Sequence, residues 1–155
     1  MRFAKAVLFS CTLVVLVLKG ALNAQQSAPT QSGPCTEQFV KEQVARNGSH
    51  AVADDAYFFS GALEKPVIGR GAKDRAFKPV VAQRTNVKSE PLKPDRIVAA
   101  GSGEIAYEYG TSNLSFDEVG SEKHIAFTAA YLRVWRSVDG SCKEAAFMAE
   151  PEGDN

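Results

Sequence analysis

The sequence predicts an α+β domain in which short helices are followed by a curved antiparallel sheet. Two observations carry this prediction. Ile105, Tyr107 and Tyr109 alternate along one stretch, which is the period of a half-buried strand. Further along, Ala129–Phe147 contains two strand-like runs separated by Asp139-Gly140, a dipeptide typical of a tight hairpin turn. Both runs carry apolar residues on both faces, so we expect the sheet to be covered on each side.

The helices are predicted in the first half of the chain. Thr36 can cap a helix over residues 37–46, and Asn47-Gly48 would end it. Ser49 can begin a short second helical turn, and residues 72–77 suit a short helix that stops near Pro79. Strands are expected over residues 56–59, 86–91, 96–100, 104–114, 125–138 and 142–148. Helices first and an antiparallel meander afterwards is the α+β pattern.

The chain is divided into four segments by its composition. Residues 1–24 have a basic start, an apolar run of 13 residues and a small-residue cleavage site, which predicts a signal peptide rather than a membrane anchor. Residues 25–34 are rich in Ser, Pro and Gln and predict a disordered linker. Residues 35–149 form one domain, and the acidic residues 150–155 form a disordered tail.

The charge balance argues against a nucleic-acid partner. The chain has 18 basic and 18 acidic residues, and residues 1–24 hold three of the basic ones and none of the acids. The mature part is therefore mildly acidic, without the basic patch that nucleic-acid binding requires. We expect an exported protein, periplasmic or secreted, that does not contact the membrane after cleavage.

Two cysteines remain in the predicted mature chain, Cys35 and Cys142. An exported protein meets an oxidising compartment in which a disulfide can persist. A bridge would fasten the first helix to the last hairpin. The alternative is two separate free thiols, because the spacing in the sequence does not show whether the two residues meet.

Four segments, in this order, resemble the nuclear transport factor 2-like superfamily, also described as SnoaL-like or ketosteroid-isomerase-like cone folds. They are Ala53–Phe59, Pro66–Phe77, Ser102–Gly110 and Tyr131–Lys143. More narrowly, the chain resembles uncharacterised exported bacterial members, which contain a domain of unknown function. The resemblance implies a cone-shaped, cystatin-like roll with the sheet wrapped around the helices, an apolar pocket at the open end, and a homodimer through the outer face of the sheet. The short sequence between Gly48 and Asp54 implies that the helix closing the cone is short.

Aromatic residues are the best candidates for the wall of that pocket, since Tyr and Trp combine an apolar body with a polar group. The predicted pocket residues are Tyr57, Phe59, Tyr107, Tyr109, Tyr131, Trp135 and Phe147. For any one of them, packing in the core is the alternative.

The sequence contains no recognisable catalytic motif. Asp55 with Tyr57 or Tyr107 could act as a base and an oxyanion donor, although Asp55 could equally lie in a surface turn. His50 and His124 lack the spacing of a metal site and are expected in exposed loops. No cofactor and no metal are expected.

Three functions are compatible with this sequence. The first is a non-catalytic domain that binds a small apolar molecule in the cone. The second is a small lyase, isomerase or hydrolase of the same fold that uses Asp55 and a tyrosine. The third is a structural or protein-interaction module whose cone is filled by its own side chains.

Overall fold

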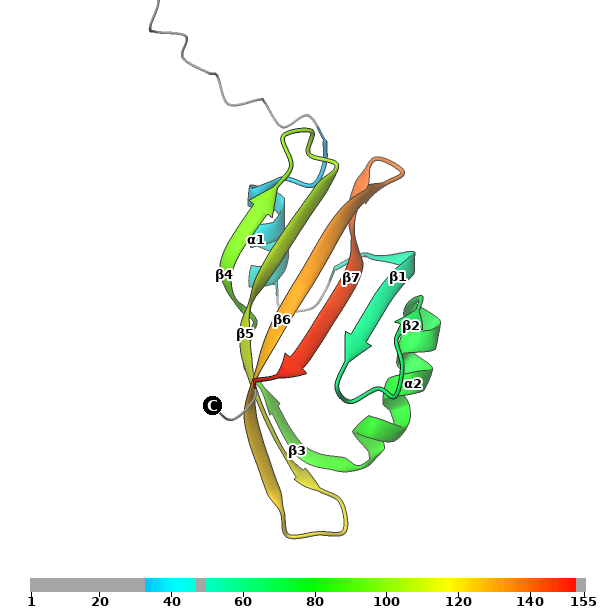
Figure 1. Cartoon of the computed structure of the whole chain (residues 1–155), viewed down its shortest axis with the longest axis vertical. Helices are drawn as coiled ribbons and strands as arrows, with labels where there is room; N and C mark the ends of the chain where they lie inside the picture. Colours follow the sequence, from blue (N-terminus) through cyan, green and yellow to red (C-terminus); the bar gives the residue numbers. More distant parts are fainter. Residues whose placement is uncertain (1–32, 47–49, 153–155) are drawn as a thin grey trace, which may run out of the picture.

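The computed structural model describes residues 33–46 and 50–152 (Figure 1). The predicted signal peptide, nearly all of the predicted linker, the helix stop at Asn47-Gly48 and the cap at Ser49 lie outside these residues. Within them, no helix is both long and apolar enough to cross a membrane.

Two helices and seven strands make up the described chain. The helices are α1 (Glu37–Ala45) and α2 (Arg70–Ala82). The strands are β1 (Val52–Ser60), β2 (Val67–Ile68), β3 (Arg84–Ser89), β4 (Lys93–Ala99), β5 (Ile105–Glu118), β6 (His124–Val138) and β7 (Ser141–Pro151).

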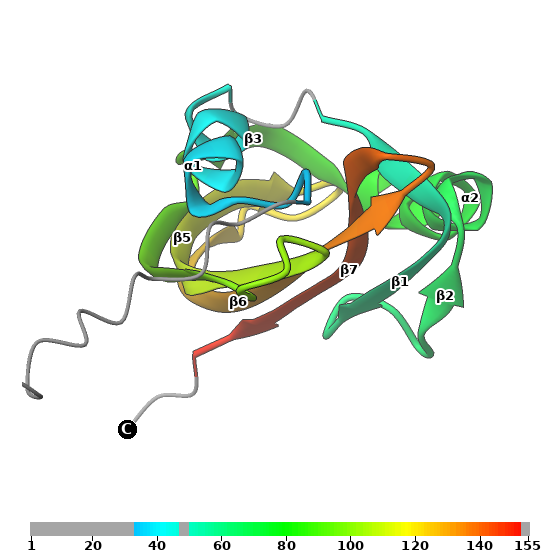
Figure 2. The same ribbon diagram turned by 90° about the horizontal axis from the view of Figure 1, so that it is seen from above.

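All seven strands form one curled sheet in the order β2-β1-β7-β6-β5-β3, and β4 also pairs with β5. Figure 2 shows the curl, with β5 at one side of the sheet and β1 and β2 at the other. The α+β class and the curved sheet are therefore confirmed. The sheet is mixed rather than antiparallel throughout, because β1 runs parallel to β7. Sequence periodicity cannot reveal this, since a strand alternates in the same way whichever direction its partner runs.

The closing hairpin agrees with its sequence signal. Asp139 and Gly140 have φ angles of 52° and 72°, and two consecutive positive values define the type I′ turn that suits the twist of a two-stranded ribbon. The neighbouring β5 and β6 pair without interruption from Ile105 opposite Arg136 to Asp117 opposite His124. Such an unbroken register fixes which side chains share a face.

We call the face of the sheet that packs against α1 the inner face. Thr36 accepts a hydrogen bond from the Phe39 amide and so begins α1 as predicted. Val40 of this helix is fully buried in a cluster with Ala106 and Trp135. Because alternate residues of a strand share a face, these contacts place the even-numbered residues of β5 and the odd-numbered residues of β6 on the inner face.

A disulfide joins Cys35, just before α1, to Cys142 at the start of β7. Both residues are buried in the same cluster as Trp135. The amide of Cys35 also donates to the carbonyl oxygen of Gly103 in the loop between β4 and β5. The segment before α1 is thus attached both to β7 and to the β4–β5 loop. Of the two possibilities left open by the sequence, the bridged one is found.

Several predicted boundaries are wrong. Residues after 50 extend into β1 rather than a second helical turn, so that a nine-residue strand replaces the four-residue strand predicted over 56–59. Helix α2 lies between β2 and β3 and continues through Pro79, although a stop was expected there. β7 runs to Pro151, two residues into the predicted tail. Just beyond the end of β7, the Glu152 amide donates a hydrogen bond to the Thr128 carbonyl oxygen, which holds the end of β7 against β6.

Candidate functional site

Four charged or titratable side chains are buried together where the inner face approaches α1. Glu108 lies on β5, Arg133 on β6 and Glu144 on β7, and His50 comes from the segment before β1. None of these side chains is more than 8% exposed, and that of Glu108 is fully buried. Charged groups are almost never buried without partners, so their mutual contacts decide whether the fold tolerates them.

The guanidinium of Arg133 links the two carboxyl groups. Its Nη1 donates to Oε1 of Glu108 over 3.0 Å, and its Nε lies 3.0 Å from Oε2 of Glu144 without the alignment of a hydrogen bond. The same Glu144 oxygen is 2.5 Å from Nε2 of His50. The four residues therefore form one continuous chain, Glu108–Arg133–Glu144–His50, which we call the buried ionic chain.

Several polar atoms around this chain have no hydrogen-bond partner among the described residues. Besides Nε of Arg133, they are Oε2 of Glu108, Nδ1 of His50, the Tyr131 hydroxyl and Nε1 of Trp135. Buried polar groups are nearly always satisfied in folded proteins. Water molecules or a ligand with matching polar groups would satisfy such atoms.

Burial changes the acidity of two of these groups. Removal from water raises the pKa of Glu108 to about 7, although the charge of Arg133 acts in the opposite direction. Burial also raises the pKa of the Tyr131 hydroxyl, and the nearby carboxyl of Glu108 adds to this effect. Near neutral pH, Tyr131 is therefore a neutral hydrogen-bond donor, and Glu108 exists in both its protonated and its ionised form.

The raised pKa of Glu108 predicts that stability falls as the pH rises from about 4.5 to 7. In this range the folded protein holds a proton that the unfolded chain has released, so the unfolded state gains from each increase in pH. The expected loss amounts to roughly 3 kcal/mol across the window. Urea unfolding at several pH values measures it, and the slope should disappear in Glu108→Gln. A slope that persists in this variant would assign it to another group.

The buried ionic chain reaches a surface pocket through His50. The pocket has a volume of about 620 Å³ and lies between α1 and the β6–β7 hairpin. Its lining residues are Pro34, Phe39, Gln43, Arg46, His50, Ala51, Gly140, Ser141 and Cys142. We call it the His50 pocket. It combines the ring of Phe39 and the disulfide residue Cys142 with a histidine whose Nε2 contacts a buried carboxylate.

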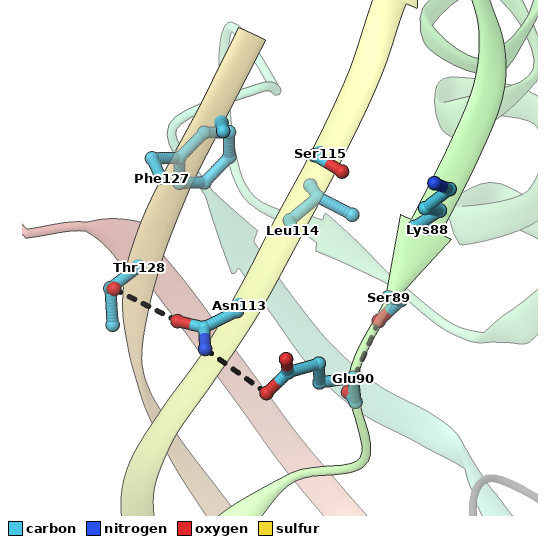
Figure 3. Close-up of a pocket in the computed structure, with 9 residues that line it drawn as sticks. Lys88, Ser89, Glu90, Asn113, Leu114, Ser115, Phe127 and Thr128 are labelled. Atoms are coloured by element: carbon cyan, nitrogen blue, oxygen red, sulfur yellow. Dashed lines mark hydrogen bonds between the residues drawn. The ribbon is translucent and has the colours of Figure 1, made fainter.

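A second hollow, of about 550 Å³, lies far from the His50 pocket, where β3 pairs with the distal half of β5 (Figure 3). Asn113 donates to Glu90 and accepts from Thr128, and these hydrogen bonds stabilise its rim. Leu114 and Phe127 supply its apolar surface. Glu90 and Asn113 are exposed, and their polar atoms are already bonded to each other and to Thr128. The hollow therefore lacks the unsatisfied buried atoms that mark the His50 side.

The structure does not bring the seven predicted pocket aromatics together. Tyr131, Trp135 and Phe147 lie on the inner face, and the rings of Tyr131 and Phe147 stack at 6.2 Å. Tyr57, Phe59, Tyr107 and Tyr109 lie on the opposite, outer face. The three tyrosines of this second group are between 40% and 47% exposed. The error came from grouping aromatics by residue type, whereas the register separates them by face.

Asp55 and Tyr107, the weak catalytic candidates, do not lie on the inner face either. Asp55 is exposed and accepts a 2.7 Å hydrogen bond from Arg136, an interaction that lowers the pKa of its carboxyl. Arg136 is opposite Ile105 on the same outer face that carries Tyr107. A carboxylate that is more acidic than usual and salt-bridged on the surface is poorly suited to act as a general base.

His50 was expected in an exposed loop and is instead mostly buried, with only 8% of its side chain accessible. Glu108, Arg133 and Glu144 were not predicted as site residues at all. The sequence did contain a signal. Arg133 is spaced two residues from the apolar Tyr131 and Trp135, and Glu108 is spaced two residues from Ala106, so each charged residue shares a strand face with apolar ones. A charge in phase with core residues indicates a buried polar group.

Comparison with solved structures identifies the fold. A nuclear transport factor 2-like superfamily protein from Salmonella enterica serovar Typhimurium LT2 aligns with 74% of this chain and 81% of its own, at a TM-score of 0.55 and 11% identity. A ketosteroid isomerase-like protein from Erwinia carotovora atroseptica aligns with 74% and 82%, at a TM-score of 0.55 and 12% identity. The chain has the nuclear transport factor 2-like fold.

The nuclear transport factor 2-like fold includes enzymes as well as proteins of other kinds. A hexachlorocyclohexane dehydrochlorinase of LinA type 3 from Novosphingobium barchaimii LL02 covers 76% of this chain and 80% of its own, at a TM-score of 0.53 and 18% identity. No protein-family model and no curated protein sequence matches the chain. At these identities the likeness shows the fold alone, so function has to be argued from the residues of this chain.

Proposed function

We propose that this protein binds a small molecule in the His50 pocket. The observation that carries the proposal is the state of His50. Its Nε2 is held 2.5 Å from a buried carboxylate, while its Nδ1 is shielded from bulk water and has no partner in the described chain. A ligand atom that reaches Nδ1 from the pocket that His50 lines would provide that partner. Ligand sites commonly combine a concave, partly apolar wall with a few well-positioned polar groups of this kind.

The ligand that suits this wall has an apolar body and one polar group. The ring of Phe39 and the disulfide provide apolar contact, and His50 and Gln43 provide polar contact. A purely apolar molecule, the first expectation from the sequence, would leave the His50 nitrogen unsatisfied. Leaving such a buried group without a partner costs about 1–3 kcal/mol.

Binding should depend on His50 and not on the other histidine. We expect His50→Gln to weaken the binding of any ligand identified by native mass spectrometry or fragment screening by roughly tenfold, because one buried hydrogen bond is lost. His124→Gln is the matched control, since His124 is 61% exposed and pairs with Asp117 on the surface. Equal affinity of the two variants would place the ligand elsewhere.

A second candidate function, proton transfer, is favoured by the contact between His50 and Glu144. A carboxylate at Nε2 stabilises the tautomer that leaves Nδ1 free to accept a proton, which is how a histidine acts as a general base. Proteins of this fold include one described as a dehydrochlorinase and one as ketosteroid isomerase-like. If a lyase or isomerase activity is found, it should be lost in His50→Gln and kept in Asp55→Asn and Tyr107→Phe. The opposite pattern would restore the Asp55 hypothesis.

We also propose a homodimer formed through the outer face. Tyr57, Tyr107, Tyr109, Ile105 and Met148 are each at least 40% exposed there, and large exposed apolar patches mark interaction sites. A two-fold contact brings the same patch of both subunits together, and the ion pair of Asp55 and Arg136 lies on the same face. Light scattering should give the mass of a dimer that Tyr107→Lys reduces to a monomer. A wild-type monomer at micromolar concentration would contradict this proposal.

Export to the periplasm or the exterior remains our proposal for localisation. The predicted signal peptide motivates it, and the disulfide between Cys35 and Cys142 is compatible with it because such bonds persist in oxidising compartments. N-terminal sequencing of the protein recovered outside the cytoplasm should begin near Gln25.

A further inference from the structure

We propose that helix α2 is a docking surface for a membrane that contains anionic lipids. No residue of this helix lines the His50 pocket, so the surface would add a second interaction to the small-molecule binding proposed above. The overall charge of the chain led us to expect no membrane contact after cleavage of the signal peptide. The way in which the charge is distributed over the structure favours such a contact.

Positive charge is concentrated on α2. The helix contains four basic residues and one acidic residue, whereas the other described residues include eleven basic and sixteen acidic ones. The basic residues are Arg70, Lys73, Arg75 and Lys78, and the acidic one is Asp74. None of these four cations forms an ion pair with a residue that the structure describes. Their charge is therefore not balanced by a neighbouring carboxylate.

This charge pattern is unfavourable for α2 itself. Its first turn contains Arg70 and Lys73 but no acidic residue, although the helix dipole is positive at this end. Arg75 and Lys78 are three positions apart, a spacing at which like charges repel each other. No residue of α2 is fully buried, so packing offsets little of this cost. A negatively charged surface would relieve the repulsion.

The side of α2 that faces solvent carries most of these cations. Lys73 lies on the packed side, where its ammonium is 4.5 Å from the ring centre of Phe58 on β1. Figures 1 and 2 show α2 at the edge of the molecule, beside β2 and away from α1. A flat surface can therefore reach the helix without meeting α1. The exposed residues of α2 include Arg70, Asp74, Arg75, Lys78 and Val81.

An anionic bilayer suits this side of α2 better than a protein partner does. A protein would need carboxylates in an arrangement that matches the cations, whereas mobile lipid headgroups can adjust to them. Val81, which is 59% exposed among the cations, can enter the boundary between headgroups and acyl chains. A basic helix with exposed apolar residues is typical of proteins that lie on a membrane surface. The proposed export would also bring the protein close to lipid.

Vesicle sedimentation tests the proposal with the mature protein recovered outside the cytoplasm. The vesicles consist of phosphatidylcholine, with or without about one third phosphatidylglycerol. The protein should sediment with the anionic vesicles in about 0.1 M salt and remain in solution with the neutral ones. Raising the salt to about 1 M should release it, because the Debye length then falls to about 3 Å.

Two pairs of substitutions test whether α2 carries the binding. Arg75→Gln/Lys78→Gln should lower the partition coefficient for the anionic vesicles by roughly 25-fold, since each basic residue close to such a surface contributes about fivefold. Lys41→Gln/Lys123→Gln is the matched control, because it removes the same charge from exposed positions on α1 and in the loop before β6. The control should bind like the wild type. An equal loss in both pairs would mean that net charge is responsible and that the proposal is wrong.

Amide hydrogen exchange locates the contact without any substitution. Anionic vesicles should protect residues 70–82 and leave the amides of α1 unchanged. No binding to anionic vesicles, equal binding to neutral ones, or protection at another part of the chain would each overturn the proposal. Binding to soluble polyglutamate but not to vesicles would overturn it as well and would assign α2 to an acidic protein partner.

Discussion

Replacing Arg133 with methionine is expected to lower the free energy of unfolding by about 3–5 kcal/mol at pH 7, the usual result of removing one partner from a buried ion pair. Arg133 is the only positive group in contact with both Glu108 and Glu144 among the described residues. Methionine fills much of the same space but leaves the two carboxyls facing each other without compensation. Urea unfolding measures the loss, and lowering the pH to about 5 should restore part of it as Glu108 takes up its proton.

Two further variants test this explanation. Arg136→Met removes a guanidinium from the outer face of the same strand, where the pair with Asp55 is exposed, and it should change stability little. Adding Glu108→Gln to Arg133→Met should recover part of the loss, because one of the two orphaned carboxylates is then gone. A similar loss in Arg136→Met, or no recovery in the double variant, would show that the buried ionic chain is not the cause.

Opening the disulfide is expected to have an effect of comparable size. The bond spans 107 residues, and the entropy of so long a loop in the unfolded chain corresponds to roughly 4–5 kcal/mol. Unfolding of the oxidised protein and of Cys35→Ser/Cys142→Ser should differ by about this amount. The double variant should also lose order around the His50 pocket, because Cys142 lines the pocket and Glu144 follows two residues later.

Reductant provides the control for this experiment. It should destabilise the wild-type protein, with a gain of two hydrogen masses, and leave the double serine variant unchanged. Both cysteines are at least 95% buried, so reduction in the folded state should be slow and should accelerate in mild denaturant. A wild-type protein whose stability does not respond to complete reduction would mean that the bridge contributes nothing to the fold.

Local rules in the sequence predicted the elements that depend on nearby residues. The Asp139-Gly140 turn needs positive φ angles, and Thr36 caps the helix that directly follows it. The extension of α2 through Pro79 was missed because a proline in a late helical turn removes one hydrogen bond without preventing the turn from forming. The parallel pairing of β1 with β7 was missed because it joins residues about ninety positions apart, and no local pattern records its direction.

The candidate site was harder to predict than the fold. The seven aromatics were chosen by residue type alone. Neighbouring residues of a strand point to opposite faces, so a difference of one position places an aromatic on the outer face instead of the inner face. Glu108, Arg133, Glu144 and His50 come from four segments, and charged residues in exposed-looking strands are usually solvated. That the three strand residues lie on the same face as Ala106 and Trp135 becomes clear only when the register is known.

The parallel pairing of β1 with β7 also sets the order in which the domain can fold. β1 pairs with β7 at Val52 and again over residues 57–60, and its other strand neighbour is the two-residue β2. A ribosome-bound chain still lacking residues 141–151 therefore has β1 synthesised but without its main partner. It also lacks Glu144 for His50 and Cys142 for Cys35. Early segments must wait for β7, so this topology places the decisive step of folding after β7 has been synthesised.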